Sequence, residues 1–280
     1  MFLLYFYGLN QDLSSKIIQN NKDEFQAGLT ALSKLTEGSV YLTSQKLMEF
    51  DNATNVTIEG PHPAGNVGIQ IHHIKPINPG EVIWTVNAQH VITIGKLFQN
   101  GYYDPGCVVS IGGSGSSNPQ TVKALIGSSI ESLLKDQLLN GSQRIISGDV
   151  LTGKRVSSDD YLGFYDSQLS VIPDEVNEIF LNWLMPGSSL HSKLNVFISS
   201  FIKPKKYIFN TSISGGNRAI VPISSYEEVV PMNILVTQLL KSLVVSDIEM
   251  AIDLGMLELA PEDLSLCSYV CPSKYDYSSI

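Results

Sequence analysis

The sequence predicts a protein of the α/β plus α+β class that ends in a helical region. Three observations support this prediction. Helical and strand patterns alternate in the first third of the chain, the middle third reads as strand, turn, strand, helix and strand, and the last third has helical spacing. We therefore expect three domains, at residues 1–105, 106–205 and 206–280.

The first third has the alternation expected of a parallel sheet. The apolar start of the chain and the segments Val40–Thr43 and Glu81–Val86 read as buried strands. Phe25, Leu29, Leu32 and Leu35 mark one face of a helix over Lys22–Glu37. Asn87 is placed to cap a second helix, which should end near Gly101. This pattern favours part of a doubly wound domain.

The middle third predicts a small β-grasp-like module. Its expected strands are residues 107–113, 121–127, 144–147, 168–172 and 193–201. Ser128 and Glu131 have the spacing of a capping box in front of a short helix.

The last third predicts helices separated by clear start and stop signals. Leucines at four-residue spacing indicate a helix over Asn233–Val244. Ser246 and Glu249 form a second possible capping box, and Pro261 can open a helix that carries Cys267. The final residues, SKYDYSSI, have the pattern of one more helix beginning.

Composition excludes several classes of protein. A net charge of −9 over 280 residues argues against nucleic-acid binding, which needs clustered Lys and Arg. The densest basic run, Lys203–Lys206, fits a solvated loop. No apolar run approaches the roughly 20 residues of a membrane-spanning helix. Three cysteines are too few for a disulfide framework and favour a reducing, cytoplasmic setting.

Two glycine motifs and a cysteine pair resemble cofactor sites but lack essential parts. Gly148–Lys154 matches part of a phosphate-binding loop, but Arg155 replaces the required Ser or Thr. GGSGSS after the strand at 107–113 lacks the third glycine of a dinucleotide fingerprint. Cys267 and Cys271 are better explained as buried thiols than as ligands of an iron–sulfur cluster, which normally takes four thiolates.

Neutral hydrogen-bond donors gather in the Gly60–Ile74 segment, GPHPAGNVGIQIHHI, which we interpret as an extended loop. The candidate site residues are His62, Gln70, His72 and His73. Zinc would require carboxylate or thiolate ligands that this segment lacks. A quinone carbonyl needs only a neutral donor beside apolar walls. On an extended backbone His72 and His73 would point to opposite faces, so one of them at most would serve a given site. Loop packing or a contact with another protein chain is the simpler alternative.

Several long segments resemble one known family. They are Asp23–Gly38, Gly60–Ile77, Ile83–Phe98, Arg144–Lys154, Arg218–Ile234 and Leu254–Tyr277. In this order they are similar to the NqrA component of the Na⁺-translocating NADH:quinone oxidoreductase (Na⁺-NQR). The resemblance implies a partial Rossmann-like domain, a β-grasp module of the soluble-ligand-binding (SLBB) type and a helical domain. Family members are longer at both ends, so we expect a truncated form.

The resemblance also implies a function. NqrA lies at the cytoplasmic face of the bacterial inner membrane without spanning it, chiefly against the membrane-embedded B subunit. It belongs to a translocase that oxidises NADH, reduces ubiquinone and exports Na⁺. The complex uses flavins and iron–sulfur centres, but no catalytic residue, metal or cofactor site is expected on this chain. Its role would be to support quinone binding. The alternatives are a purely structural scaffold and a soluble nucleotide-binding enzyme.

Overall fold

The computed structural model describes residues 2–5, 11–174, 185–193, 195–202, 207–212 and 216–280. The chain forms two compact units. The first contains Met1–Gly106, Ile220–Cys271 and Tyr275–Ile280, and the second contains Cys107–Ala219 and Pro272–Lys274. The last part of the chain therefore packs with the first part. The division into three sequence domains stays a prediction.

The first unit is built on a four-stranded parallel sheet. Its strands are β1 (Phe2–Tyr5), β2 (Val40–Ser44), β3 (Thr54–Thr57) and β4 (Trp84–Asn87). They lie in the order β3-β2-β1-β4, and β1 pairs in parallel with both β2 and β4. This is the strand order at the centre of doubly wound folds. The predicted parallel sheet is confirmed.

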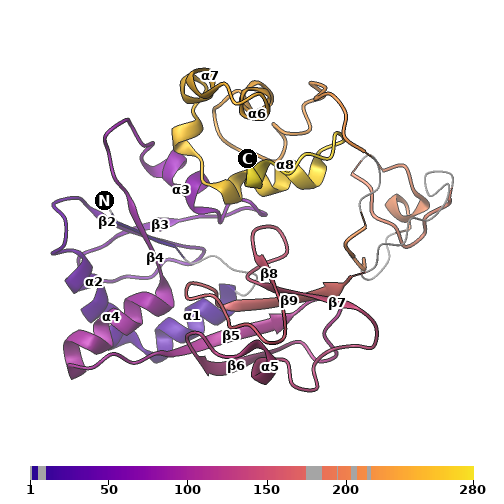
Figure 1. The fold of residues 1–280 in the computed structure, drawn as a ribbon. Coiled ribbons are helices and arrows are strands. Elements are labelled where there is room, and N and C mark those ends of the chain that lie inside the picture. Colours follow the sequence, from indigo (N-terminus) through magenta and orange to yellow (C-terminus); the bar gives the residue numbers. More distant parts are fainter. Residues whose placement is uncertain (1, 6–10, 175–184, 194, 203–206, 213–215) are drawn as a thin grey trace. The chain divides into compact units, whose positions relative to one another are not determined.

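Helices cover both faces of this sheet. On one side lie α1 (Gln11–Asn20), α2 (Lys22–Leu32) and α4 (Ala88–Asn100), and on the other lies α3 (Val67–Ile74) with the C-terminal helices (Figure 1). Phe25, Leu29 and Val91 are fully buried between α2, α4 and the sheet. The predicted cap is confirmed, because the Asn87 side chain accepts the N–H of His90 at 3.0 Å.

One predicted strand of this unit differs from the structure. β4 begins at Trp84 rather than Glu81, and Trp84 is 59% exposed. The expectation of a fully buried strand was wrong because β4 is the last strand in the sheet order, at the sheet's edge.

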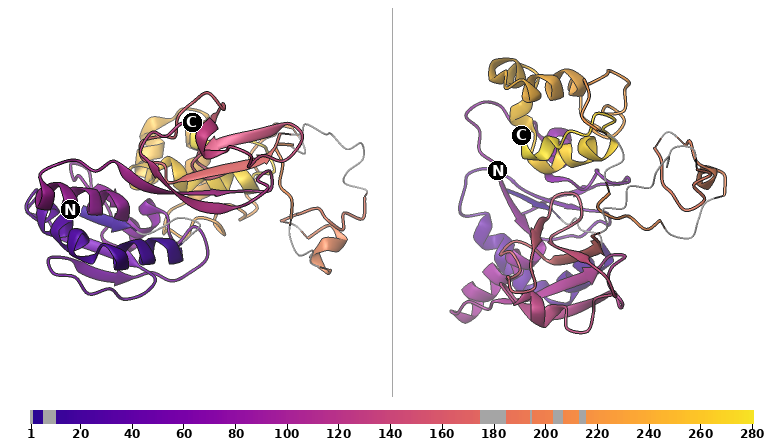
Figure 2. Two further views of the ribbon diagram at one scale, coloured as in Figure 1. Left: turned by 90° about the horizontal axis from the view of Figure 1, so that it is seen from below. Right: turned by 45° about the vertical axis from the view of Figure 1, so that its right-hand side comes forward.

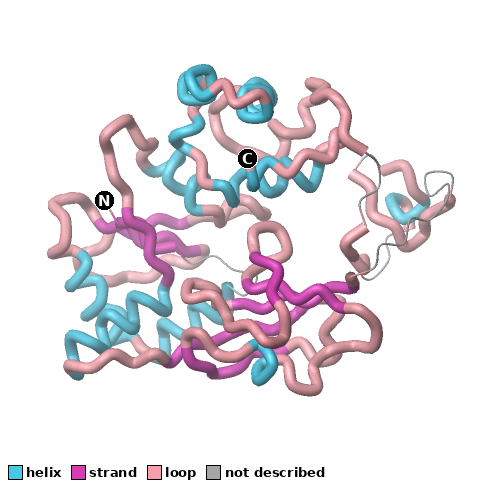
Figure 3. Tube along the Cα trace, viewed as in Figure 1, coloured by secondary structure: helices cyan, strands magenta, loops and turns pink. Residues whose placement is uncertain are grey.

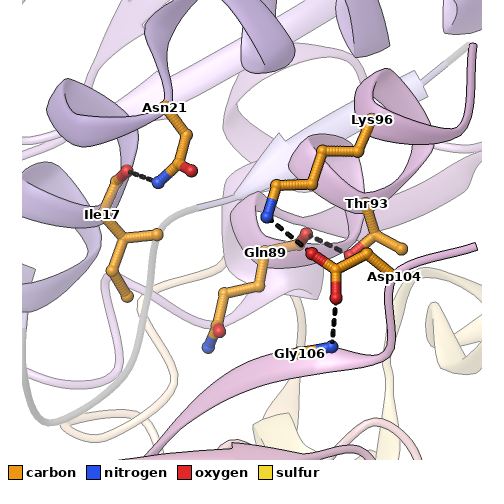
Figure 4. A network of polar contacts seen from close by, with 7 residues as sticks. All are labelled: Ile17, Asn21, Gln89, Thr93, Lys96, Asp104 and Gly106. Carbon is orange, nitrogen blue, oxygen red and sulfur yellow. Dashed lines mark hydrogen bonds and ion pairs between the residues drawn. The ribbon is translucent and has the colours of Figure 1, made fainter. Parts of the chain in front are cut away.

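Polar contacts fix the end of α4 (Figure 4). Lys96 Nζ lies 2.8 Å from a carboxylate oxygen of Asp104, whose other oxygen accepts the N–H of Gly106 at 3.0 Å. The Lys96 ammonium, together with the Gly106 amide, lowers the pKa of Asp104. This ion pair ties the chain that leaves α4 back onto the helix.

Two glycines allow α2 and α4 to cross at very short distance. A Cβ added to Gly28 would lie 2.1 Å from the carbonyl oxygen of Val91. A Cβ added to Gly95 would lie 1.7 Å from the carbonyl oxygen of Glu24. Because real atoms never approach so closely, only glycine fits at either position.

The second unit is a five-stranded mixed sheet. Its elements are β5 (Gly106–Gly112), β6 (Gln120–Leu125), α5 (Ile130–Leu133), β7 (Gln143–Ser147), β8 (Lys154–Val156) and β9 (Gln168–Pro173). The strand order is β6-β5-β9-β7-β8. Figure 2 shows the strands of this unit as magenta and pink arrows. β9 is parallel to β5 and antiparallel to β7. Val109, Leu169 and Val171 are fully buried in its core.

Two predictions for this unit were wrong. Ser129, not Ser128, caps α5, because the Ser128 hydroxyl is used to close a turn with Leu125. The described part of the expected strand at 193–201 contains a 3-10 turn, η2 (Ile198–Ser200), and residue 194 lies outside the described residues. Its apolar side chains, Val196 and Phe201, face solvent instead of a neighbouring strand.

Short helices make up the C-terminal part of the first unit (Figure 3). They are α6 (Val236–Val244), α7 (Ile248–Asp253), η3 (Met256–Glu258), η4 (Pro261–Leu264), α8 (Ser265–Val270) and η5 (Tyr277–Ser279). Pro261 opens the turn before α8, as predicted. Asp247, not Ser246, caps α7, because Ser246 adopts a left-handed conformation with φ of 58°. The final residues form only the short turn η5.

The crossing of α2 and α4 gives a first prediction. Gly95→Ala should lower the free energy of unfolding by about 1–3 kcal/mol, because the two helices must separate to admit one methyl group. Gly112→Ala is the matched control, since nothing lies within 4 Å of a Cβ at that position. Denaturant unfolding compares the two variants. Equal stability of both would contradict the close helix crossing.

Candidate functional site

The Gly60–Ile74 segment is not an extended loop throughout. Its second half is the helix α3, preceded by Asn66 in the capping position. His72 and His73 are therefore neighbours on a helix, with ring centroids 5.3 Å apart, and do not lie on opposite faces of a strand. The glycines and prolines before Asn66 concealed a helical spacing of Val67, Ile71 and Ile74, which could have revealed α3.

The apolar residues of α3 are covered by this chain itself. Ile69 packs in one core with Tyr226 and Leu264 of the C-terminal part. Val67 and Ile71 form a smaller cluster with partly buried residues from around the sheet, namely Tyr41, Ile74, Ile77 and Ile83. The apolar surface of this segment therefore does not require an external ligand to cover it.

The amide of Gln70 is committed to contacts within the chain. The hydroxyl of Thr43, at the end of β2, donates to Gln70 Oε1 at 2.7 Å. Gln70 Nε2 donates to the carbonyl of Gly65 at 3.0 Å. Since the side chain is also buried, its two polar atoms link α3 to the sheet and to the preceding turn.

The two histidines attach α3 to the C-terminal part. His72 Nε2 accepts the backbone N–H of Asn233 at 3.1 Å, so Nδ1 must carry the proton and donate to Glu258 at 2.7 Å. His73 Nε2 donates to the carbonyl of Pro231 at 2.9 Å. Both side chains therefore serve the packing of α3 in this structure.

A residue that the sequence analysis missed, Asp263, packs against the start of α3 from a different element. Asp263 of η4 is fully buried, and one of its oxygens accepts the N–H of Ala260 at 2.9 Å. A Cβ added to Gly68 would lie 1.9 Å from the same oxygen, so the carboxylate occupies space that only glycine leaves open. Asn66 donates to the neighbouring carbonyl of Glu262 at 3.1 Å.

Burial dominates the electrostatics of Asp263. It raises the pKa of the carboxyl, and the amide groups of Ala260, Asn66 and Ile69 only partly offset this. Among the described residues the second oxygen, Oδ1, has no hydrogen-bond partner. The sequence did contain a signal for this contact. Asp263 lies three positions after Ala260, in a turn that begins with Pro261, which is the spacing of an acidic side chain that caps the start of a helix.

The four candidate residues do not form one open site. Gln70 is buried toward the sheet, His72 and the exposed His73 contact the C-terminal part, and His62 is exposed before α3. No group of three His, Cys, Asp or Glu side chains that could hold a metal occurs within the described ranges. The arrangement joins helix, sheet and C-terminal segment, with His62 at the exposed start of the segment.

Comparisons with known proteins assign the chain to a family. The family pattern described as "NqrA second alpha/beta domain" matches residues 9–103, and "NQRA C-terminal domain" matches residues 108–158. The chain is 41% identical over 270 residues to the A subunit of the Na⁺-translocating NADH-quinone reductase of Hahella chejuensis. It is 43% identical over 268 residues to that of Teredinibacter turnerae. The chain belongs to the NqrA family.

The match to the NqrA family covers nearly all of this chain but only part of the length of its relatives. It covers 94% of the chain and 60% of the length of each of these two relatives. An NAD⁺-reducing [NiFe]-hydrogenase in the air-oxidised state is 10% identical, with a TM-score of 0.45, over 61% of this chain and 40% of that one. A likeness this weak supports no inference about function.

The incomplete motifs of this NqrA-family chain are turns and core residues. Asp149 accepts the N–H groups of Leu151 and Thr152, which closes the Gly148–Lys154 segment as a turn leading into strand β8, not a helix. The Cys271 thiol lies 3.2 Å from the hydroxyl of Tyr226 in a buried core. Burial, together with this contact, raises the pKa of Tyr226 to about 12.

No helix in the described part of the chain combines the length and the apolar character needed to cross a membrane.

The buried carboxyl gives a second prediction. Because folding raises the pKa of Asp263 above its ordinary value of 3.8, the folded state binds the proton more tightly than the unfolded state. Stability should therefore fall as the pH rises from about 4 through the raised pKa. Asp263→Asn should remove this decline, whereas Asp253→Asn, at an exposed carboxyl of the same unit, should keep it. Unfolding curves from pH 4 to 8 test this, and an unchanged decline in Asp263→Asn would contradict it.

Proposed function

We propose that this chain is part of the NqrA component of a sodium-pumping NADH:ubiquinone reductase. The observation that carries the proposal is the collinear similarity to known NqrA proteins along 94% of the chain. In this proposal the chain binds no redox cofactor. NADH, flavins and iron–sulfur centres belong to other components, and the chain lies on the cytoplasmic face of the inner membrane, chiefly against the B subunit.

Two roles within such a complex are compatible with family membership. The chain could provide a donor to the ubiquinone carbonyl, or it could act as a scaffold that holds the complex together. The contacts of Gln70, His72 and His73 favour the scaffold role for these three residues, because their polar atoms are used within the chain. His62, which is exposed, is the residue through which a quinone contact is proposed.

Purification of the intact complex tests the main proposal. The complete protein, tagged in the cell that makes it, should co-purify from detergent-solubilised membranes with NADH-dependent, Na⁺-stimulated quinone reductase activity. Reconstituted into liposomes, the same preparation should transport Na⁺ when NADH and quinone are supplied. If the reductase activity remained in the unbound fraction while the tagged protein was fully recovered, the assignment would be wrong.

Two histidine variants separate the roles, and they give the third prediction. One neutral hydrogen bond contributes about 0.5–1.5 kcal/mol, so His62→Ala should raise the apparent quinone KM by roughly 2- to 13-fold. His72→Ala removes two contacts of α3 and should lower the melting temperature of the protein without changing that KM. Titration with a soluble quinone in the assembled complex measures both. An unchanged KM in His62→Ala would leave only the scaffold role.

A further inference from the structure

Helix α7 turns its apolar side chains to solvent. Ile248 and Ile252 are one turn apart and lie on the same side of the helix, where they are 63% and 42% exposed. Val245, in the turn before α7, is 72% exposed. Ala251 is the one residue of α7 that is buried. A surface helix normally has the opposite arrangement, with its large apolar residues toward the core.

The preceding helix α6 does not share this reversal. In the neighbouring helix α6, Leu239 and Leu240 are fully buried, and the polar Lys241 is exposed. α7 packs mainly against α6 and η3 through its small residue Ala251. The exposed isoleucines are therefore not needed for packing within the described part of the unit. An uncovered apolar stripe of this kind marks an interaction surface.

Acidic side chains border the exposed stripe. Asp247, Glu249 and Asp253 all belong to α7 or its cap, and all three are exposed. Lys241 is the nearest exposed basic residue along the chain, in the last turn of α6. The border is thus predominantly negative, within a chain whose net charge is already −9.

The acidic border favours one kind of binding partner for the exposed face of α7 over the others. A second copy would place one acidic border against another, which like-charge repulsion opposes. An anionic lipid surface is opposed for the same reason, since acidic lipids attract Lys and Arg rather than Asp and Glu. An amphipathic protein helix with Lys or Arg beside its apolar face matches both the apolar stripe and its acidic border.

We propose that the face of α7 formed by Val245, Ile248 and Ile252 is a docking site for a basic amphipathic helix of a partner protein. The apolar side chains of that helix bury the two isoleucines, and its basic residues pair with Asp247, Glu249 and Asp253. The site is independent of the Gly60–Ile74 segment and of any quinone contact.

Photo-crosslinking in the complete protein tests this proposal. A photoreactive phenylalanine analogue replaces Ile248 in one variant and Val82 in a control, since Val82 is an equally exposed apolar residue of the same unit. After illumination in the intact cell, mass spectrometry maps the attachment site. The expected adduct at 248 is a partner segment that has an apolar helical face bordered by Lys or Arg, and it is absent at 82.

Two further changes test the two parts of the proposed contact. Ile252→Asp should lower the adduct yield at 248 roughly tenfold or more, since an interface isoleucine is replaced by a carboxylate. Reversing two of the three acidic border charges, with Glu249→Lys and Asp253→Lys, should lower the yield several-fold by opposing the basic partner. All three positions are exposed, so circular dichroism should show an unchanged fold.

Several outcomes would overturn the proposal. An adduct with a second copy of this chain or with lipid would assign the face to a different occupant. An adduct with a protein segment that lacks basic residues, or a yield unaffected by charge reversal, would reject the predicted chemistry. No adduct at 248, or the same adduct at 82, would show that α7 is not a docking site.

Discussion

The first unit depends on a carboxylate buried against the start of a helix. Asp263 can reach this position only because residue 68 is a glycine, and the surrounding amides offset only part of the cost of burying its carboxyl group. Burying a carboxyl group without a hydrogen-bond partner is highly unfavourable, so the N–H of Ala260, which donates to Asp263, is essential to this arrangement. The contact joins residues almost two hundred positions apart and makes the last part of the chain a layer of the first unit.

The other contacts of α3 follow from this docking. With η4 held at the beginning of the helix, Glu258 and the backbone of Asn233 come within hydrogen-bonding distance of the two ring nitrogens of His72. Toward the sheet, Gln70 reaches Thr43 at the end of β2. A segment rich in neutral donors thus becomes a connector between sheet and C-terminal helices. This explains the composition of α3 without requiring a ligand, while His62 lies at the exposed start of the segment.

Patterns in the sequence predicted helices, strands and caps that depend on neighbouring residues. They were less successful for contacts between segments that are distant in the sequence. The strand at Val40–Thr43, the cap at Asn87 and the Pro261 turn were predicted correctly because their signals are local. The helix after Asn66 was missed because a Gly- and Pro-rich approach precedes only two turns of helix. The cap formed by Asp263 had a sequence signal that was missed, but its contact with α3 could not be predicted, since nothing near it in sequence indicates that Gly68 provides the space it fills.

Hydrogen exchange in a Gly68→Ala variant tests the docking of α3 most directly. The added methyl group would lie 1.9 Å from the Asp263 carboxylate, so α3 and η4 must separate. We expect the amides of α3 and α8 to exchange faster together, while those of α2 and α4 keep their wild-type protection. Wild-type protection of both α3 and α8 in the variant would contradict the account, because the buried carboxylate would then not hold the C-terminal part in place.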